Sequence, residues 1–216
     1  VNAARSSWSR EQAETAWQAV DDREILLARQ EVTIAEHGDW ADVELHEAYQ
    51  NQTGRNQEVV YYFSLPESAV VTGLWLGDEG GKKFQYRVAP RGAAQAVYRN
   101  EVRRNVDPAL VEQIGPRQYR LRVYPVPPRQ FSRSRGFDLG LPQDAPALHM
   151  WLTFRVLARD NAWDLPRLAE KRNLFWDART VRIVNGQALN VETQTWLPAS
   201  VKAATSVTAI AHQINF

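Results

Sequence analysis

Alternating hydrophobic and polar residues predict that most of this chain folds into β-strands. Val32 and Ile34 alternate with polar neighbours, and the segment 40–46 alternates in the same way. Residues 59–63 form a continuous apolar run that is short enough to be a strand buried in a core. We expect this strand to end before Pro66, because proline has no N–H group to donate to a neighbouring strand.

Further strands are predicted along the rest of the chain. Residues 70–76 and 84–88 flank a glycine-rich turn, and this order predicts a hairpin. Apolar residues alternate with arginines from 118 to 123, which indicates a strand with a basic outer face. Residues 150–157 have a strong strand pattern of their own.

The clearest hairpin signal lies near the C-terminus. Residues 180–184 and 189–193 have strand-like patterns, and Asn185 and Gly186 lie between them. Asn-Gly is the favoured pair for a type I′ turn, because both of its central positions require positive φ. We therefore predict two antiparallel strands joined at this pair.

Three segments have patterns that are typical of helices. An apolar stripe with helical spacing begins after Ser9, and Ile25 and Leu26 extend it. Pro90 precedes an alanine-rich segment and suits the first turn of a second helix. Residues 164–174 predict a third, short helix.

Together these patterns predict a mainly β fold. We expect an antiparallel β-sandwich with an inserted short helix and an N-terminal helix. The length of 216 residues suits one domain or slightly more, and is sufficient to bury a hydrophobic core without disulfides. Three parts are predicted: an N-terminal helical linker over 1–30, a β core over 31–130, and a C-terminal β-rich extension over 131–216 that packs on the core.

Charge is nearly balanced overall but is unevenly distributed along the chain. The formal net charge is +1, yet residues 1–81 carry 5 Lys/Arg and 15 Asp/Glu, whereas residues 82–135 carry 13 and 3. One interpretation is that the acidic and basic parts lie side by side in the fold and compensate each other. The other is an exposed basic face for anionic lipid, polysaccharide or nucleic acid.

The second interpretation points to the segment that begins at residue 117. Basic and aromatic residues mix here, as they do in proteins that bind single-stranded nucleic acid. However, Tyr119 shares the inward-facing period of Leu121 and Val123, so nucleic acid is the weaker interpretation. Anionic lipid head groups or a protein would also suit these cations. The candidate interaction surface consists of Arg117, Arg120, Arg122, Arg129, Arg133 and Arg135.

Patterns of catalytic or metal-binding residues are scarce. The chain has no cysteine, which excludes disulfides and thiolate metal sites. His46-Glu47 resembles the start of a zinc-protease helix, but Gln50 occupies the position of the required second histidine. The other histidines lack ligand-like spacing, and the carboxylates of Glu44 and Glu47 show no sign of burial. We therefore assign no catalytic, cofactor-binding or metal-binding residue.

Landmarks within residues 30–130 resemble a known domain family. They are the strand end FSLPESAVVTG at 63–73, the Arg/Ala segment 91–98, the segment DPALVEQ at 107–113, and a strand that runs into PVPP at 125–128. In this order and at this spacing they resemble the VIT domain, the module named from vault protein and the inter-alpha-trypsin inhibitor heavy chains. The landmark residues themselves look structural: Pro66 as a strand stop, and Glu112 and Gln113 as internal hydrogen-bond partners.

Longer stretches are similar to one bacterial group within this family. These are VELHEAYQNQT, YYFSLPESAVVTGLWLG, VAPRGAAQAVYRNEV and DPALVEQIGPRQYRLR, and they resemble exosortase-associated (PEP-CTERM) integral membrane proteins. The resemblance implies the extracytoplasmic, soluble portion of a longer membrane protein, and a chain that begins at Val1 fits this expectation. Many VIT relatives continue into a von Willebrand A domain with a metal-binding Asp-x-Ser-x-Ser. That motif is absent here, so metal-dependent adhesion is not expected.

This resemblance implies a non-enzymatic protein-interaction module in an exosortase-linked surface-sorting or exopolysaccharide system. Its expected partners are a protein of the cell envelope and the rest of its own membrane-spanning chain, and it requires no cofactor. Anionic lipid or polysaccharide binding is a second class of function. A third is an envelope-associated hydrolase or transferase, which a deep polar pocket with convergent carboxylates or a histidine would favour.

Overall fold

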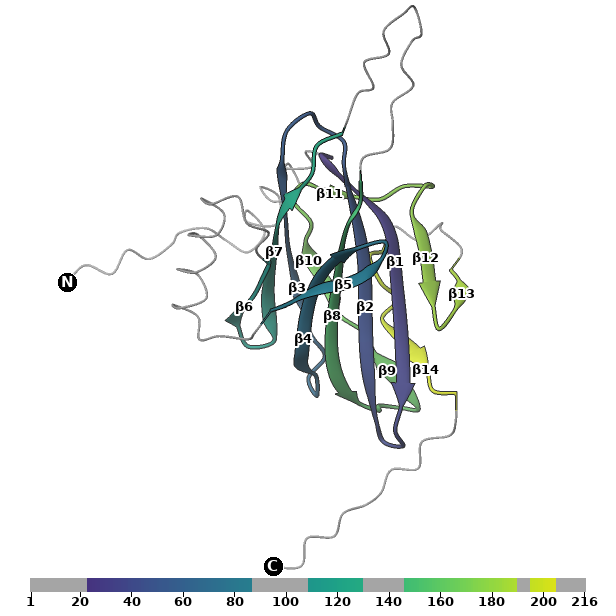
Figure 1. Cartoon of the computed structure of the whole chain (residues 1–216). Helices are drawn as coiled ribbons and strands as arrows, with labels where there is room; N and C mark the ends of the chain where they lie inside the picture. The colour runs from purple at the N-terminus through teal and green to yellow at the C-terminus, as the bar shows by residue number, and fades with distance from the viewer. Residues whose placement is uncertain (1–22, 87–108, 130–145, 190–194, 205–216) are drawn as a thin grey trace, which may run out of the picture.

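The computed structural model describes residues 23–86, 109–129, 146–189 and 195–204. These residues form 14 β-strands in three sheets (Figure 1), which confirms the mainly β prediction. None of them is helical, and none belongs to a helix that could cross a membrane.

The largest sheet has eight strands. Its order is β13, β12, β1, β2, β8, β4 and β5, and β11 also pairs with β1. β11 and β12 run parallel to β1, so the expectation of a purely antiparallel fold was wrong. Parallel pairing requires a long connection between strands, and β1 is far from both partners in sequence. The bounds are β1 Ile25–Glu36, β2 Trp40–Asn51, β4 Val70–Asp78, β5 Gly81–Tyr86, β8 Leu148–Leu157, β11 Leu174–Phe175, β12 Val181–Val184 and β13 Gln187–Ala188.

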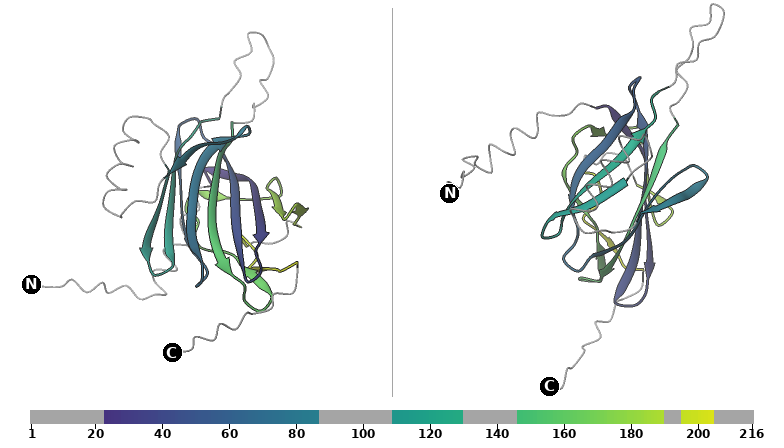
Figure 2. Two further views of the ribbon diagram at one scale, coloured as in Figure 1. Left: turned by 60° about the horizontal axis from the view of Figure 1, so that its bottom comes forward. Right: turned by 60° about the vertical axis from the view of Figure 1, so that its left-hand side comes forward.

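Two smaller sheets complete the fold. The four-stranded sheet has the order β10, β3, β7 and β6, and its pairs are all antiparallel. β9 and β14 form a separate antiparallel pair. Figure 2 shows these strands from two further directions. The bounds are β3 Gln57–Ser64, β6 Ala109–Gly115, β7 Gln118–Val126, β9 Ala162–Asp164, β10 Arg167–Glu170 and β14 Ser200–Lys202.

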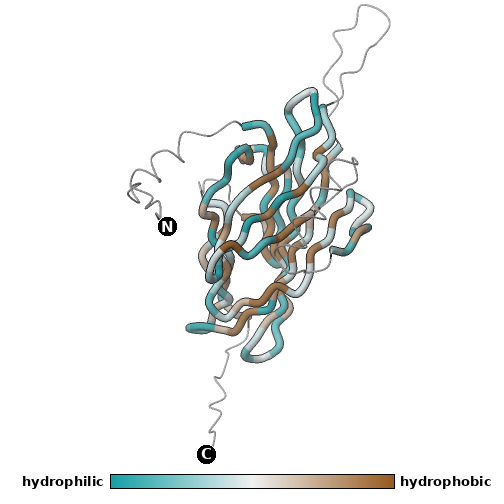
Figure 3. The backbone as a smooth tube through the Cα atoms, turned by 90° about the vertical axis from the view of Figure 1, so that its left-hand side faces the viewer, coloured by the Kyte–Doolittle hydropathy of each residue, from teal (hydrophilic) through white to brown (hydrophobic). Residues whose placement is uncertain are grey.

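One hydrophobic core is shared by the two larger sheets. Leu45, Leu152 and Phe154 enter it from the eight-stranded sheet, and Tyr61 and Leu121 enter it from the four-stranded sheet. All five side chains are fully buried. Hydrophobic and hydrophilic positions alternate along the strands in Figure 3, as expected for strands with one face towards a core.

β8 lies at the centre of the large sheet although it belongs to the C-terminal part of the chain. It pairs with β2 on one side and with β4 on the other. Its inward-facing residues Met150, Leu152 and Phe154 are fully buried, and Trp163 and Trp196 from the same part of the chain also belong to the core. The described residues of the predicted 131–216 extension thus include a central strand.

The predicted N-terminal helical linker does not extend to residue 30. Ile25 and Leu26, which we expected to continue the helix, begin β1 instead. A bulge between Leu27 and Arg29 interrupts the strand alternation, so three consecutive apolar residues are buried here. This irregularity hid the strand in the sequence. The segment after Ser9 and the predicted inserted helix after Pro90 lie outside the described residues.

The predicted helix over 164–174 was wrong. β9 ends at Asp164, and residues 167–170 form β10, which pairs with β3. Leu168 lies opposite Phe63 in this ladder. The strand is determined by its pairing with a segment far away in sequence, and such tertiary contacts outweigh local propensity.

Both predicted hairpin turns are confirmed, but the second strand of the C-terminal hairpin is β13 at 187–188 and not 189–193, of which residues 190–193 lie outside the described residues. β4 and β5 pair antiparallel across the glycine-rich turn, and β12 and β13 pair across Asn185 and Gly186. These two residues have φ values of 48° and 77°, the left-handed conformation that a type I′ turn requires. The Asn185 side chain also accepts a hydrogen bond of 2.9 Å from the backbone N–H of Ile34, which ties the turn to β1.

Candidate functional site

Glu47 on β2 places a carboxyl group in the middle of the core. It follows Leu45 on the inward-facing side of the strand and is fully buried. Its Oε1 accepts hydrogen bonds from Gln30 Nε2 at 2.8 Å and from Trp196 Nε1 at 2.7 Å. Its Oε2 accepts from the hydroxyls of Tyr49 at 2.6 Å and Tyr61 at 2.9 Å. These four donors match the four lone-pair positions of a carboxylate.

The electrostatics of this Glu47 cluster (Glu47, Gln30, Tyr49, Tyr61 and Trp196) are those of a deeply buried acid. Burial raises the pKa of Glu47, while the hydrogen bonds from its four donors oppose that rise. Burial and the Glu47 charge together raise the pKa values of Tyr49 and Tyr61 well above the usual range. The protein's own donors fill the acceptor positions of the carboxyl group. Because these donors come from different segments, the carboxyl group joins β1, β2, β3 and the Trp196 segment.

A cation lies close to this cluster. Arg182 on β12 is opposite Gln30 in the sheet and is almost fully buried. Its Nη1 donates to the carbonyl of Thr195 at 2.7 Å. Burial lowers the pKa of Arg182, whereas the Glu47 charge raises it. Arg182 therefore provides positive charge near the buried acid and holds the residue next to Trp196.

Two histidines meet on the outer face of the large sheet. His46 on β2 and His149 on β8 have their Nε2 and Nδ1 atoms 2.9 Å apart, and the His46 ring stacks on Trp151 at 4.5 Å. This pair cannot be predicted from the sequence alone, because it depends on the register between β2 and β8. Glu31 Oε2 is 3.9 Å from His46 Nδ1. Among the described residues no group of three ligands could hold a metal ion.

Protonation of His46 is unfavourable in this position. Burial and the neighbouring His149 lower the pKa of His46 from 6.5 to about 4, and burial also lowers the pKa of His149. Below pH 6.5 the unfolded chain therefore takes up a proton at residue 46 before the folded chain does. Stability contributed by neutral His46 is present above pH 6.5 and is lost as the pH falls towards 4.

We expect His46→Phe to weaken the pH dependence of stability. Phenylalanine keeps a ring for stacking on Trp151 but cannot be protonated. Because solvent screens this half-buried ring, the unfolding free energy of the wild-type chain should fall by only about 1–2 kcal/mol relative to that of the variant between pH 6.5 and 4. Urea unfolding of both proteins at a series of pH values would measure this. If the difference in unfolding free energy between the two proteins stayed constant from pH 6.5 to 4, protonation of His46 would not be the cause of the pH dependence.

Two arginines of the predicted interaction surface form ion pairs within the fold. Arg120 pairs with Glu112, whose side chain is almost fully buried, and Arg122 makes two hydrogen bonds to Glu58 of 2.9 and 3.0 Å. The Arg122 pair joins the basic and acidic parts of the chain, as expected if these two parts lie side by side and compensate each other's charge. The Glu112 pair agrees with the internal role expected for that residue.

The other predicted surface arginines are differently placed. Arg117 lies in the turn between β6 and β7, and the backbone N–H of Arg129 donates to the carbonyl of Thr53 at 2.9 Å. Arg133 and Arg135 lie outside the described residues. The basic interaction surface stays a prediction, with Arg117 as its exposed member at one end.

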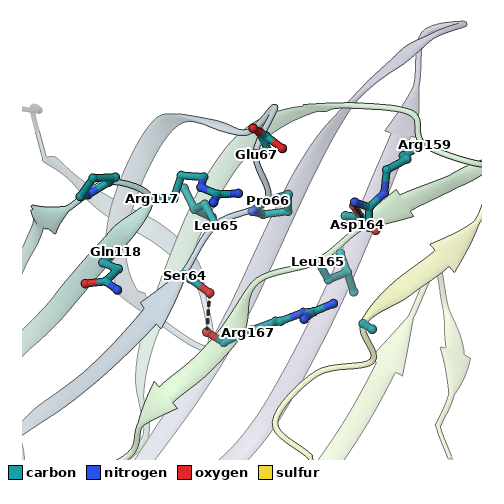
Figure 4. Close-up of a pocket in the computed structure, with 12 residues that line it drawn as sticks. Ser64, Leu65, Pro66, Glu67, Arg117, Gln118, Arg159, Asp164, Leu165 and Arg167 are labelled. Carbon is teal, nitrogen blue, oxygen red and sulfur yellow. Dashed lines mark hydrogen bonds and ion pairs between the residues drawn. The ribbon is translucent and has the colours of Figure 1, made fainter. Parts of the chain in front are cut away.

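Arg117 also lines a pocket of about 300 Å³, shown in Figure 4. Backbone contacts join the segments around it: Leu65 N–H donates to the Arg117 carbonyl, and Leu165 N–H donates to the Ala199 carbonyl, both at 3.0 Å. Ser64 also lies opposite Arg167 in the β3–β10 ladder. The lining residues are Ser64, Leu65, Pro66, Glu67, Pro116, Arg117, Gln118, Arg159, Asp164, Leu165, Arg167 and Ala199.

The pocket combines apolar surface with charged walls. Leu65 and Leu165 are nearly fully buried. Arg159 forms an ion pair of 2.7 Å with Asp164. By contrast, the exposed side chains of Arg117 and Arg167 have no hydrogen-bond or ion-pair partner within the part of the chain that the structure describes. Sequence analysis identified Arg117 but missed the other pocket residues, because four separate segments form it.

Comparisons with known proteins identify one family. The model of the vault protein inter-alpha-trypsin domain, VIT, matches residues 27–134, which is half of the chain. The match ends before β8 and therefore excludes the central strand of the large sheet. No curated protein matches the chain.

Proposed function

The chain belongs to the VIT family, and from this premise we propose that it is a non-enzymatic protein-interaction module of an integral membrane protein in the bacterial cell envelope. VIT domains are in general protein-interaction modules, which is consistent with a protein partner. The resemblance of four sequence stretches to exosortase-associated proteins supports the finer context. In that context the domain is extracytoplasmic and serves a surface-sorting or exopolysaccharide system.

The observation that carries this proposal is the pocket beside Arg117. Strand pairing and backbone hydrogen bonds hold its walls, so its shape is formed before a partner arrives. Its exposed arginines, Arg117 and Arg167, offer hydrogen-bond donors that the described part of the fold does not use. A preformed site with available donors suits recognition of another molecule.

We also propose that the basic segment continues the contact surface from Arg117 towards Arg135. Arg120 and Arg122 form ion pairs within the fold, so the candidates that continue the surface from Arg117 are Arg129, Arg133 and Arg135. Exposed cations accelerate encounter with an acidic partner, and this contribution weakens as salt is added. The binding of the partner should therefore be salt-sensitive.

Affinity capture tests the proposed function. The 216-residue chain is immobilised and exposed to an envelope extract at low and high salt, beside a variant with Arg129, Arg133 and Arg135 changed to serine. We expect a defined protein to be retained at low salt, and its recovery to fall at least about fivefold in the variant.

Two results would count against the proposal. Equal recovery by both versions would remove the basic segment from the contact surface. Recovery of lipid or polysaccharide alone, with no protein enriched over a blank resin, would contradict a protein-interaction module. Reconstitution with the purified partner then confirms that the contact is direct.

A further inference from the structure

The pocket carries two guanidinium groups that are available to a ligand. Arg117 reaches it from the β6–β7 turn and Arg167 from the start of β10, as Figure 4 shows. Neither has a side-chain partner among the described residues, whereas the third arginine, Arg159, is held by Asp164. A guanidinium always carries its charge and presents five N–H donors, so it binds carboxylates and phosphates well.

The charges of the lining favour an anionic ligand. Three arginines and two acidic residues, Glu67 and Asp164, give the lining a formal charge of +1. This matches a singly charged carboxylate. Glu67 and Asp164 repel either anion, so inorganic phosphate is the competing ligand that the experiment must distinguish from a carboxylate.

The apolar part of the pocket indicates what the carboxylate is attached to. Leu65 and Leu165 line the pocket but are only 4% and 2% exposed, so the apolar surface open to a ligand comes from Pro66 and Ala199 beside the arginines. Aliphatic carbons of a ligand would bury against this surface while its carboxylate meets the guanidinium groups. A volume of about 300 Å³ is at the small end of ligand sites, and it accommodates one or two amino-acid side chains.

The backbone at Arg117 places its side chain at the pocket. Gly115 pairs with Gln118, so Pro116 and Arg117 are the two residues of the turn, and Arg117 has φ 58°. A positive φ at this turn position is normally occupied by glycine or asparagine, because other side chains crowd the backbone. Arg23 and Arg172 also have positive φ in this fold, so the turn explains where the Arg117 side chain lies and does not by itself identify a ligand.

From these observations we infer that the pocket binds the carboxylate of an aspartate or glutamate in an acidic peptide segment of the protein partner. Arg117 and Arg167 hold the carboxylate, and the apolar surface takes the aliphatic neighbour of the acidic residue. This inference rests on the proposed function, since it names the chemistry that the interaction module recognises.

Titration of the isotope-labelled 216-residue chain with capped peptides tests the inference by NMR. The acidic probe is acetyl-Ala-Leu-Glu-Ala-amide, and the matched neutral probe has glutamine in place of glutamate. We expect saturable shifts at residues 64–67, 116–118 and 199 with the acidic probe. The neutral probe should bind at least about tenfold more weakly, because it lacks the charge-assisted hydrogen bonds.

Two variants separate binding from folding. Arg117→Gly removes the guanidinium and relieves the positive φ, so its melting temperature should be equal to or higher than that of the wild-type chain. Affinity for the acidic probe should nevertheless fall at least about tenfold. Arg55→Gln is the matched control: it removes one exposed arginine before β3, at the opposite end of that strand from Ser64, and should leave binding unchanged.

Several outcomes would overturn the inference. Equal affinity for the two probes, or unchanged binding by Arg117→Gly, would remove the carboxylate contact. Saturable binding of glucuronate or inorganic phosphate at these arginines without binding of the acidic peptide would assign the pocket to a different anion. None of these results would affect capture of a protein partner by another surface, so the proposed function is tested separately.

Discussion

Replacing Glu47 with leucine should destabilise the domain by about 4 kcal/mol or more. Leucine fills similar space but accepts no hydrogen bond. The side-chain NH2 group of Gln30 and the indole N–H of Trp196 can only donate, so both would remain buried without this acceptor. Arg182 would also lose the nearby negative charge. Since domains of this size are stable by about 5–15 kcal/mol, denaturant unfolding should show a large loss.

Glu47→Gln is the matched control for that prediction. Its carbonyl oxygen can accept from Gln30 and Trp196, while its amide group faces the hydroxyls of Tyr49 and Tyr61, which can accept as well as donate. We therefore expect this variant to fold with a much smaller loss. If leucine and glutamine had the same effect, the hydrogen bonds to the carboxyl group would not be what stabilises this part of the core.

A chain cut after residue 134, where the family match ends, should not fold on its own. The cut removes β8, and both β2 and β4 lose the strand that lies between them. It also removes Trp163 and Trp196 from the core, and with Trp196 one donor to Glu47. The free energy lost with so much buried apolar surface exceeds the usual unfolding free energy of a whole domain. Circular dichroism and NMR spectra of the fragment should be those of an unfolded chain.

Complementation provides the control. If residues 135–216 are supplied as a second polypeptide, β8 can return to its place, and we expect the strand signal and dispersed NMR spectrum to recover in the mixture. A fragment of residues 1–134 that folds cooperatively without this addition would show that the family-matched part is an independent domain. The central position of β8 would then be unnecessary for the fold.

The positions of many strands along the chain could be predicted from the sequence. The alternation around Leu45 and the Asn185-Gly186 turn each follow from local rules, and the structure confirms both elements. Local rules failed where distant pairing decides the conformation. The bulge after Leu27 hid the start of β1, and pairing with β3 converted the expected helix over 164–174 into β10.

The candidate site was harder to predict because its parts come from separate segments. The alternation of Val43 and Leu45 continues through Glu47 to Tyr49, so the inward position of Glu47 was present in the pattern. The predicted strand ends at residue 46 and therefore does not include Glu47. The partners of Glu47 and the assembly of the Arg117 pocket depend on strand register, which a single sequence does not reveal.

Hydrogen exchange tests the central claim most directly, because it locates the contact surface of the captured partner on the folded domain. The 216-residue chain is compared alone and bound to that partner. We predict slower exchange in the complex at residues 64–67, 116–118 and 159–167, with little change on the outer face of β1, β2 and β8. Protection confined to that outer face, with the pocket segments unchanged, would contradict the assignment of the pocket as the recognition site.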